Sequence, residues 1–316
     1  MNRVIRFLKD WALPVSMIVG VAAYFLFVAL PFGPRAHAMA NRAVGIIQPA
    51  LLFCMLFISF CKVDPGKIRL RRWHLWLALI QSGSFILMAL IIHFCHCPEN
   101  IRILIESAMI CLICPTATAA VVVTDKLGGN LAGTVSYLVL INVAATFLIP
   151  LVIPVVNPSA SMGFWAYVGH IALKVFPLLV LPGLLAWTIR YTTHKLQRVL
   201  MRWATNTFYV WGVGLTLAMV LATRALLLSG LGAWAIAGIV GVSILCCFVQ
   251  FFAGRRLGAG DSITPGQTLG QKNTGFLIWL GYNYMTPVTS VAGGLYAIWQ
   301  NLFNSWELYR KEKRAA

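Results

Sequence analysis

A lysine, Lys272, stands in the middle of a segment that is otherwise apolar enough to cross a membrane, residues 263–282. It belongs to the polar run GQKNTG between Gly270 and Gly275, whose glycines interrupt the apolar pattern. Charged side chains inside a membrane are costly, and they commonly mark the pathway of an ion or a substrate. The type and position of this lysine therefore indicate binding of a charged solute.

A second interruption occurs in the apolar segment 101–125, where Pro115 follows Cys114. Proline removes a backbone N–H donor and clashes with the preceding turn, so it frees backbone carbonyls in the middle of the segment. Exposed helix ends cannot face hydrocarbon, and both interruptions must therefore be buried or line a cavity. We interpret the two breaks as the walls of a binding site.

Cys111 and Cys114 form a CxxC pair, which favours a rival class of protein, a membrane thiol oxidoreductase that shuttles electrons. Such an enzyme would normally also need a cysteine pair at the membrane surface, and Cys95 and Cys97 would provide one. The first pair stands beside a proline break that solute transport already explains. We therefore favour transport and expect that the protein is not an enzyme.

The composition requires a lipid environment. Hydrophobic residues make up 60% and charged residues 10% of the 316 positions, which leaves too little polar surface to cover a water-soluble globule of this size. We expect a single integral membrane domain, residues 1–316, with the lipid bilayer as its partner. The net charge of +17 comes from basic residues between apolar runs rather than on a soluble surface, which excludes nucleic-acid binding.

The apolar runs predict ten spans, at 12–30, 44–61, 74–94, 101–125, 132–156, 163–189, 204–228, 232–253, 263–282 and 284–306. The first run is too long for the core of a signal peptide. With the N-terminus inside, the outer segments hold only Arg35, Arg42, Arg102 and Arg224, and the other basic residues between spans lie inside. The positive-inside rule then predicts a multi-pass protein of a bacterial-type inner (plasma) membrane, with both termini cytoplasmic.

Ten spans divide into two sets of five, residues 12–156 and 163–306. Because each set has an odd number of spans, the second set enters the membrane from the opposite face, and the two sets form inverted repeats. Transporters of this kind bind their solute near the midplane, where discontinuous helices occupy corresponding positions of the repeats. The fourth and ninth spans correspond in this way, and both are interrupted. The pattern predicts an all-α polytopic secondary transporter.

Three motifs resemble those of the bile acid:sodium symporter family: CPTATA at 114–119, GQKNTG at 270–275 and YAIWQN at 296–301. The number and spacing of the spans are also similar. The resemblance implies the fold of that family, with a core of spans 3–5 and 8–10 and a panel of spans 1, 2, 6 and 7. Spans 4 and 9 would cross at their breaks, and substrates would reach the crossing through the cleft between core and panel.

The resemblance also implies sodium ligands, and at these positions the chain departs from the family. The positions are occupied here by Ala120, Val121, Thr134, Leu138, Thr268 and Lys272. Thr268 replaces a central glutamate and Lys272 replaces a glutamine. Sodium needs several oxygen ligands and preferably a negative charge, so much of its coordination is lost.

Lys272 adds a positive charge at the place of the sodium ion. Two unit charges about 4 Å apart repel by about 4 kcal/mol at an effective dielectric of 20. We expect the ammonium group to substitute for sodium, so that transport is sodium-independent and needs no metal or other cofactor. Two alternatives stay open, a sodium-coupled symporter with altered ligands and, because burial disfavours the charged form of a lysine, proton coupling.

Positive charge beside the N-termini of two half-helices favours a negatively charged substrate. We expect a small organic anion, bile-acid-like or another amphipathic carboxylate or sulfonate, moved by alternating access. Glu106 and Asp125 are the candidate partners of Lys272, and Lys174 either contacts the anion or is structural. The expected binding residues are Thr116, Thr118, Thr134, Thr268, Gln271, Lys272, Asn273 and Thr274, with Cys114, Pro115 and Gly270 forming the breaks.

Overall fold

The computed structural model describes residues 12–31, 33–95, 97–203, 207–258 and 260–315. Within these ranges the regular structure is entirely helical, which confirms the all-α prediction. The basic residues Arg3, Arg6 and Lys9, and the predicted start of the seventh span at 204, lie outside the described residues.

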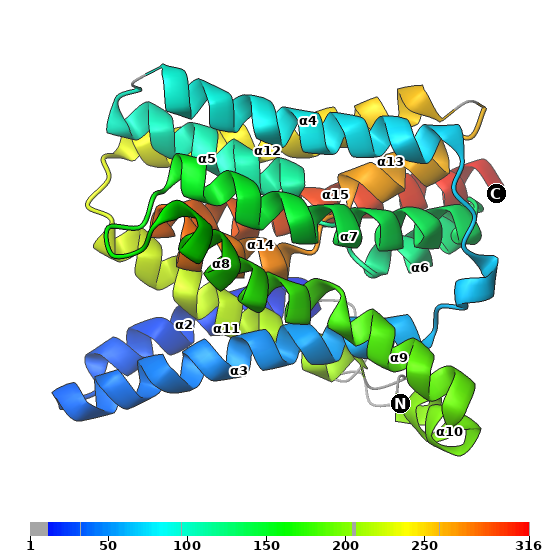
Figure 1. Ribbon diagram of the computed structural model, residues 1–316, viewed down its shortest axis with the longest axis horizontal. Helices are drawn as coiled ribbons and strands as arrows, with labels where there is room; N and C mark the ends of the chain where they lie inside the picture. Colours follow the sequence, from blue (N-terminus) through cyan, green and yellow to red (C-terminus); the bar gives the residue numbers. More distant parts are fainter. Residues whose placement is uncertain (1–11, 32, 96, 204–206, 259, 316) are drawn as a thin grey trace.

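The chain forms the following helices (Figure 1): α2 (Ala12–Ala29), α3 (Pro34–Cys61), α4 (Arg72–Phe94), α5 (Glu99–Ile113), α6 (Ala119–Leu127), α7 (Leu131–Val156), α8 (Phe164–Leu179), α9 (Leu181–Thr192), α10 (His194–Trp203), α11 (Thr207–Leu228), α12 (Ala233–Leu257), α13 (Ile263–Gly270), α14 (Thr274–Tyr284) and α15 (Ser290–Ala315). Short 3₁₀ turns occur at Pro65–Lys67 and Pro287–Thr289.

Several helices are long and apolar enough to cross a membrane. By length and composition these are α4, α7, α12 and the part Ala38–Cys61 of α3, and the pair α8 and α9 passes the same test as one span bent by 41°. Large apolar side chains lie exposed along them, such as Phe147 at 65% and Leu173 at 76%. Since lipid is the solvent that such a surface prefers, the helices indicate a membrane-embedded protein.

Both predicted interruptions are confirmed. The helix α5 ends at Ile113 and α6 begins at Ala119, so the fourth predicted span is broken at Cys114 and Pro115. The helix α13 ends at Gly270 and α14 begins at Thr274, so the ninth predicted span is broken in the polar run.

The helices differ from the predicted spans at three other positions. The predicted span 163–189 is bent at Val180, because Pro182 in the first turn of α9 cannot donate a backbone hydrogen bond to the preceding turn. The helix α3 begins at Pro34 rather than at 44, and α15 begins at Ser290 rather than at 284. The amphipathic helix α10 was not predicted as an element at all.

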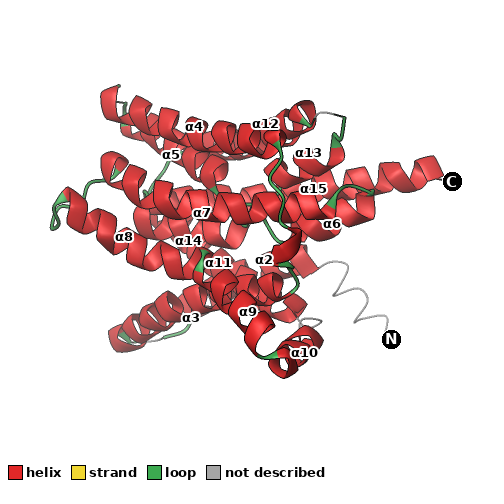
Figure 2. Ribbon diagram, turned by 45° about the vertical axis from the view of Figure 1, so that its right-hand side comes forward, coloured by secondary structure: helices red, strands yellow, loops and turns green. Residues whose placement is uncertain are grey.

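Most helices fall into two groups (Figures 1 and 2), which touch through α8 and through the contacts of α11 with α14 and α15. In the first group α12 packs on α5, α13 and α15, and α4 packs on α5 and α7. In the second group α11 packs on α2 and α3, and α3 packs on α9. The helix α8 contacts both α7 and α3 and so joins the groups.

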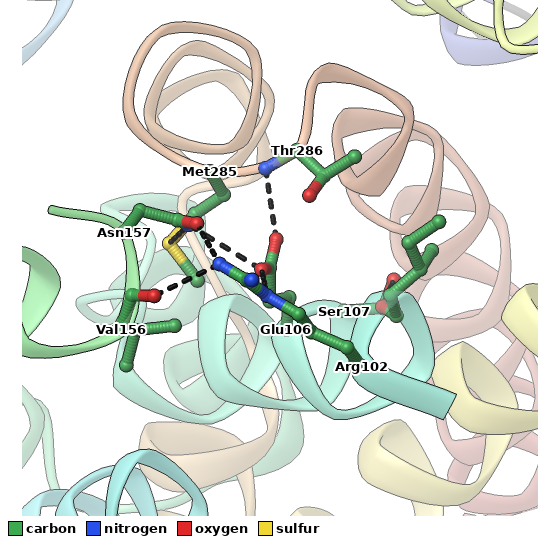
Figure 3. A network of polar contacts seen from close by, with 8 residues as sticks. Arg102, Glu106, Ser107, Val156, Asn157, Met285 and Thr286 are labelled. Carbon is green, nitrogen blue, oxygen red and sulfur yellow. Dashed lines mark hydrogen bonds and ion pairs between the residues drawn. The ribbon is translucent and has the colours of Figure 1, made fainter. Parts of the chain in front are cut away.

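A buried carboxylate ties together three segments at one end of the first group (Figure 3). Glu106 in α5 is fully buried, and it is paired with Arg102 one turn earlier at 2.9 Å. It also accepts hydrogen bonds from the backbone N–H of Thr286 (2.8 Å) and from the side chain of Asn157 (3.4 Å). Arg102 donates in turn to the carbonyl of Val156 (2.9 Å). The network fixes the amino-terminal half of α5 to the end of α7 and to the turn before α15.

Replacing Glu106 with leucine is expected to lower the stability of the protein by about 3 kcal/mol, because it leaves the arginine and the Thr286 N–H without their acceptor. The value lies at the lower end of the usual range because the Arg102 side chain is 36% exposed. Thermal unfolding in detergent measures the effect. Asp125→Leu is the matched control, since Asp125 is exposed, and equal melting of the two variants would contradict a structural role for the network.

Candidate functional site

The two broken helices meet at their extended segments and hydrogen-bond to each other. The backbone N–H of Ala117 donates to the carbonyl of Gln271 (3.0 Å), and the N–H of Asn273 donates to the carbonyl of Pro115 (2.9 Å). The segments thus run antiparallel as a short bridge, without any strand on either side. Backbone groups that the breaks release inside an apolar protein must find partners, and here each break supplies them to the other.

Local sequence explains why each helix stops where it does. Cys114 precedes a proline and adopts the extended conformation that such a position favours, with φ −51° and ψ 128°. At the other break, the Asn273 side chain accepts a hydrogen bond from the N–H of Phe276 (3.3 Å) and caps the start of α14. At Gly270, a Cβ atom would lie 2.3 Å from the ring of Phe251, so only glycine allows α13 to approach α12 this closely.

Buried glutamines satisfy the remaining backbone groups of the crossing. The side-chain amide of Gln300 in α15 accepts from the N–H of Lys272 (2.9 Å) and donates to its carbonyl (3.3 Å). The amide of Gln81 in α4 donates to the carbonyls of Ile113 (3.0 Å) and Cys114 (2.9 Å) at the end of α5. These side chains act as substitutes for a neighbouring strand, and they hold both breaks in place.

The Lys272 side chain lies inside the crossing with 0% exposure. Its ammonium group has one oxygen neighbour at hydrogen-bond distance, the carbonyl of Leu112 at 3.4 Å, which is a long and weak contact. The thiols of Cys111, Cys114 and Cys246 are close enough to interact with it electrostatically. Across the part of the chain that the structure describes, no carboxylate forms an ion pair with this lysine.

Neither candidate partner of Lys272, Glu106 or Asp125, forms an ion pair with it. Glu106 is engaged by Arg102, one turn earlier on α5, and Asp125 is exposed near the end of α6. Both acids belong to the fourth predicted span, but the lysine side chain reaches the carboxyl end of α5, about two turns from Glu106. Lys174, the other intramembrane cation, is exposed on α8.

A cluster of threonine hydroxyls occupies the place that the resemblance assigns to sodium. The hydroxyl of Thr268 donates to that of Thr134 (3.2 Å), and Thr134 donates to Thr124 (3.3 Å). Thr116 donates to the carbonyl of Thr268 (2.7 Å). All four residues are fully buried. The hydroxyls satisfy one another, so they need no ion to complete their hydrogen bonding.

These residues do not fit a sodium ion. The neighbouring positions Ala120, Val121 and Leu138 offer no side-chain oxygen, and the hydroxyls that remain are neutral. A hard cation would have to displace the hydrogen bonds among the threonines without gaining a negative ligand.

Among the other expected binding residues, Gln271 and Thr274 are buried and Thr118 is half-buried. The amide of Gln271 donates to Gln267, which donates to Glu307, and Glu307 pairs with Arg255, so this chain of contacts runs along α13 away from the crossing. The thiol of Cys114 donates to the carbonyl of Asn273 (3.0 Å). Of the eight predicted binding residues, Thr118 and Thr274 have no described side-chain or backbone bond across the crossing.

Sequence reasoning missed Gln81, Thr124 and Gln250. The amide of Gln250 in α12 donates to the carbonyl of Cys111 (3.2 Å) and to the hydroxyl of Tyr296 (3.1 Å). The two glutamines are polar residues within apolar spans, the same signal that identified Lys272. A search for uncharged polar residues within apolar spans would therefore have identified Gln81 and Gln250.

Comparison with models of known protein families finds no match for this chain, and comparison with curated proteins finds none either. The resemblance to the bile acid:sodium symporter family consequently rests on the three motifs and on the spacing of the spans.

Proposed function

We propose that this protein is a secondary transporter of small organic anions in which Lys272 takes the place of a bound sodium ion. The observation that carries the proposal is the fully buried ammonium group at the meeting point of two broken helices, with one weak oxygen contact and no carboxylate partner among the described residues. A cation held in this way lacks a counter-charge, and an anionic substrate would supply it.

The arrangement of polar contacts supports two inverted repeats. Tyr137 and Tyr296 are each the seventh residue of their helices, α7 and α15. Tyr137 donates to Gln81 (2.9 Å), which serves the end of α5, and Tyr296 accepts from Gln250 and donates to the carbonyl of Gly270 (2.8 Å) at the end of α13. Under the proposal, spans 3, 4 and 5 are equivalent to spans 8, 9 and 10, so each pair reaches the break of its own repeat, and Gln250 donates in addition to the carbonyl of Cys111 in the other repeat.

The two groups of helices support the division into core and panel. The group that contains α4, α5, α7, α12, α13 and α15 corresponds to the proposed core of spans 3–5 and 8–10. The group that contains α2, α3, α9 and α11 corresponds to the panel of spans 1, 2, 6 and 7. In this proposal the panel and the core move against each other around the crossing, in an inner membrane with both termini cytoplasmic.

The burial of the thiols leads us to favour transport over the thiol oxidoreductase. Cys111 and Cys114 are both 0% exposed, whereas an exchanging thiol must be reached by its partner. The threonine cluster leads us to favour sodium independence over a sodium-coupled symporter with altered ligands.

Counterflow in proteoliposomes tests the proposal. Vesicles loaded with unlabelled anion are expected to accumulate radiolabelled phenylacetate or taurocholate at initial rates that agree within about twofold when sodium is replaced by potassium, because a fixed ammonium supplies the positive charge. A collapse of accumulation in potassium would refute sodium independence. Accumulation of neither anion above that in protein-free vesicles would refute the transport of organic anions.

A further inference from the structure

A cavity of about 240 Å³ lies between α3, α11 and α14, beside the middle of α3 and near the carboxyl ends of α11 and α14, which the proposed topology places outside. Gly45 and Gln48 from α3, Arg224 from α11, and Trp279, Tyr282 and Asn283 from α14 line it. These residues recur at helical spacing on each element, so one face of every helix is turned to the cavity. Neither the motifs nor the resemblance pointed to any of them.

Gln48 is the residue of the lining that favours a bound ligand. Its side chain is 3% exposed, and its Nε2 atom has no hydrogen-bond partner among the described residues. Leaving a buried amide donor unsatisfied costs free energy, because water solvates it in the unfolded chain. A donor that lines a cavity and has no acceptor in the protein is suited to an acceptor on a bound molecule.

The charge of the lining selects an anion. Arg224 is the charged residue of the cavity, and its lining includes neither aspartate nor glutamate. A guanidinium group can bind a carboxylate with two parallel hydrogen bonds, and the Gln48 amide can donate a further one. The amide of Asn283 donates to the carbonyl of Trp279 (2.8 Å), so at most one of its two N–H groups is left for a bound anion.

Shape and size narrow the ligand further. The rings of Trp279 and Tyr282 give the cavity an aromatic wall, against which a flat apolar frame can pack. Pockets for drug-sized ligands usually enclose roughly 300–1,000 Å³, so a cavity of about 240 Å³ suits a smaller molecule. A single-ring carboxylate fits these limits, and a steroid does not.

A contact between α3 and α14 lies one helical turn beyond the cavity, in the direction of the crossing. Leu52 lies one helical turn beyond Gln48 on α3, and its side chain packs where a Cβ atom on Gly275 would come within 3.0 Å of it. Gly275 is the second residue of α14, whereas Trp279 lies about one turn further along that helix. An anion that moved from the cavity toward the crossing between α3 and α14 would have to pass this contact.

We infer that this cavity is the outer recognition site of the transporter and that it takes a small monocarboxylate with a flat, single-ring frame, held by Arg224 and Gln48. The inference rests on the proposed function, because it specifies the anion that is carried and the side from which it is first bound. Lys272 would be the second positive group that the anion meets after the contact at Leu52 opens.

Equilibrium binding of radiolabelled phenylacetate to the full-length protein in detergent tests the inference. We expect saturable binding that benzylamine, the cation of similar shape, does not displace and that taurocholate displaces at least tenfold less well than unlabelled phenylacetate. Arg224→Gln is expected to weaken binding at least tenfold, because it removes a charge-assisted pair. Lys174→Gln is the matched control, since it removes one positive charge from a span and leaves the cavity unchanged.

Gln48→Met separates a role in binding from a role in folding. Methionine has a similar length and no donor, so the variant is expected to bind phenylacetate about threefold to tenfold more weakly while its melting temperature stays equal or rises. A structural glutamine would instead lower the melting temperature when it is replaced.

The outcomes distinguish this inference from the proposed function. Equal binding by Arg224→Gln and Lys174→Gln, or displacement by taurocholate as effective as by phenylacetate, would overturn the assignment of the cavity and leave the counterflow result untouched. Absence of any phenylacetate binding to the wild-type protein would also overturn it. The proposed transport of organic anions fails instead if neither anion is accumulated by the wild-type protein in vesicles.

Discussion

Replacing Lys272 with methionine is expected to abolish anion counterflow, with a fall in initial rate of at least a hundredfold, while the protein stays folded. The lysine Nζ atom makes one contact, at 3.4 Å, with the carbonyl of Leu112, so its removal sacrifices little hydrogen bonding. Methionine fills nearly the same volume without a charge. Because a buried charge is costly in a membrane protein, the melting temperature of the variant is expected to equal or exceed that of the wild type.

The counterflow rate and the melting temperature of Lys272→Met together distinguish three possible roles of the lysine. A lysine that merely fills space would tolerate methionine in both measurements, and a lysine that holds the crossing together would lose stability along with transport. Counterflow of phenylacetate and thermal unfolding in detergent, measured on the same preparation, separate the three cases. Lys174→Met is the control, since Lys174 is exposed on α8. Wild-type rates in Lys272→Met would contradict the role proposed for the ammonium group.

The positions of the two breaks could be predicted because they follow from local chemistry. A proline at 115 and a polar run bounded by glycines at 270 and 275 both disfavour a continuous helix, and the structure interrupts both helices there. The bend at Val180 was missed although Pro177 and Pro182 stand on either side of it. Prolines are tolerated in membrane helices, as Pro150 within α7 illustrates, and sequence alone does not say which of them bends the chain.

The partners of the breaks could not be predicted in the same way. Gln300 was recognised as part of a motif, but its bonds to the backbone of Lys272 join residues 28 positions apart and depend on how α15 packs against the crossing. Gln81 lies 32 positions before the carbonyl of Ile113 that it serves. Amide side chains donate and accept with equal ease, so their identity does not reveal which backbone group they will meet.

The same limit explains why neither candidate carboxylate lies beside Lys272 in the structure. From sequence, Glu106 and Asp125 were the candidate counter-charges, because they are the acidic residues within the predicted spans. In the structure Glu106 has a nearer cation on its own helix face, Arg102, at the i, i+4 spacing that favours pairing. Local pairing took precedence over a contact between distant segments, and the lysine was left without a carboxylate among the described residues.

Gln300→Leu is expected to have the largest effect on stability among uncharged substitutions at the crossing. The change removes both partners of the Lys272 backbone, whose N–H and carbonyl bond to the same amide at 2.9 and 3.3 Å. Each buried group left unpaired costs about 1–3 kcal/mol, so the variant is expected to lose about 2–6 kcal/mol. A fall in the thermal unfolding midpoint in detergent, with slower anion counterflow, measures the effect.

Asn301→Leu is the matched control for this prediction. Asn301 is the next residue of α15 and belongs to the same motif, but its amide donates to the carbonyl of Ala297 on its own helix (2.7 Å) and leaves no distant group unpaired when it is lost. The contrast between neighbours isolates the contribution of the crossing from that of helix α15. If both variants melted alike, the Lys272 segment would be held by its bridge to the other break rather than by Gln300, and the crossing would be a rigid pair of half-helices that needs no support from α15.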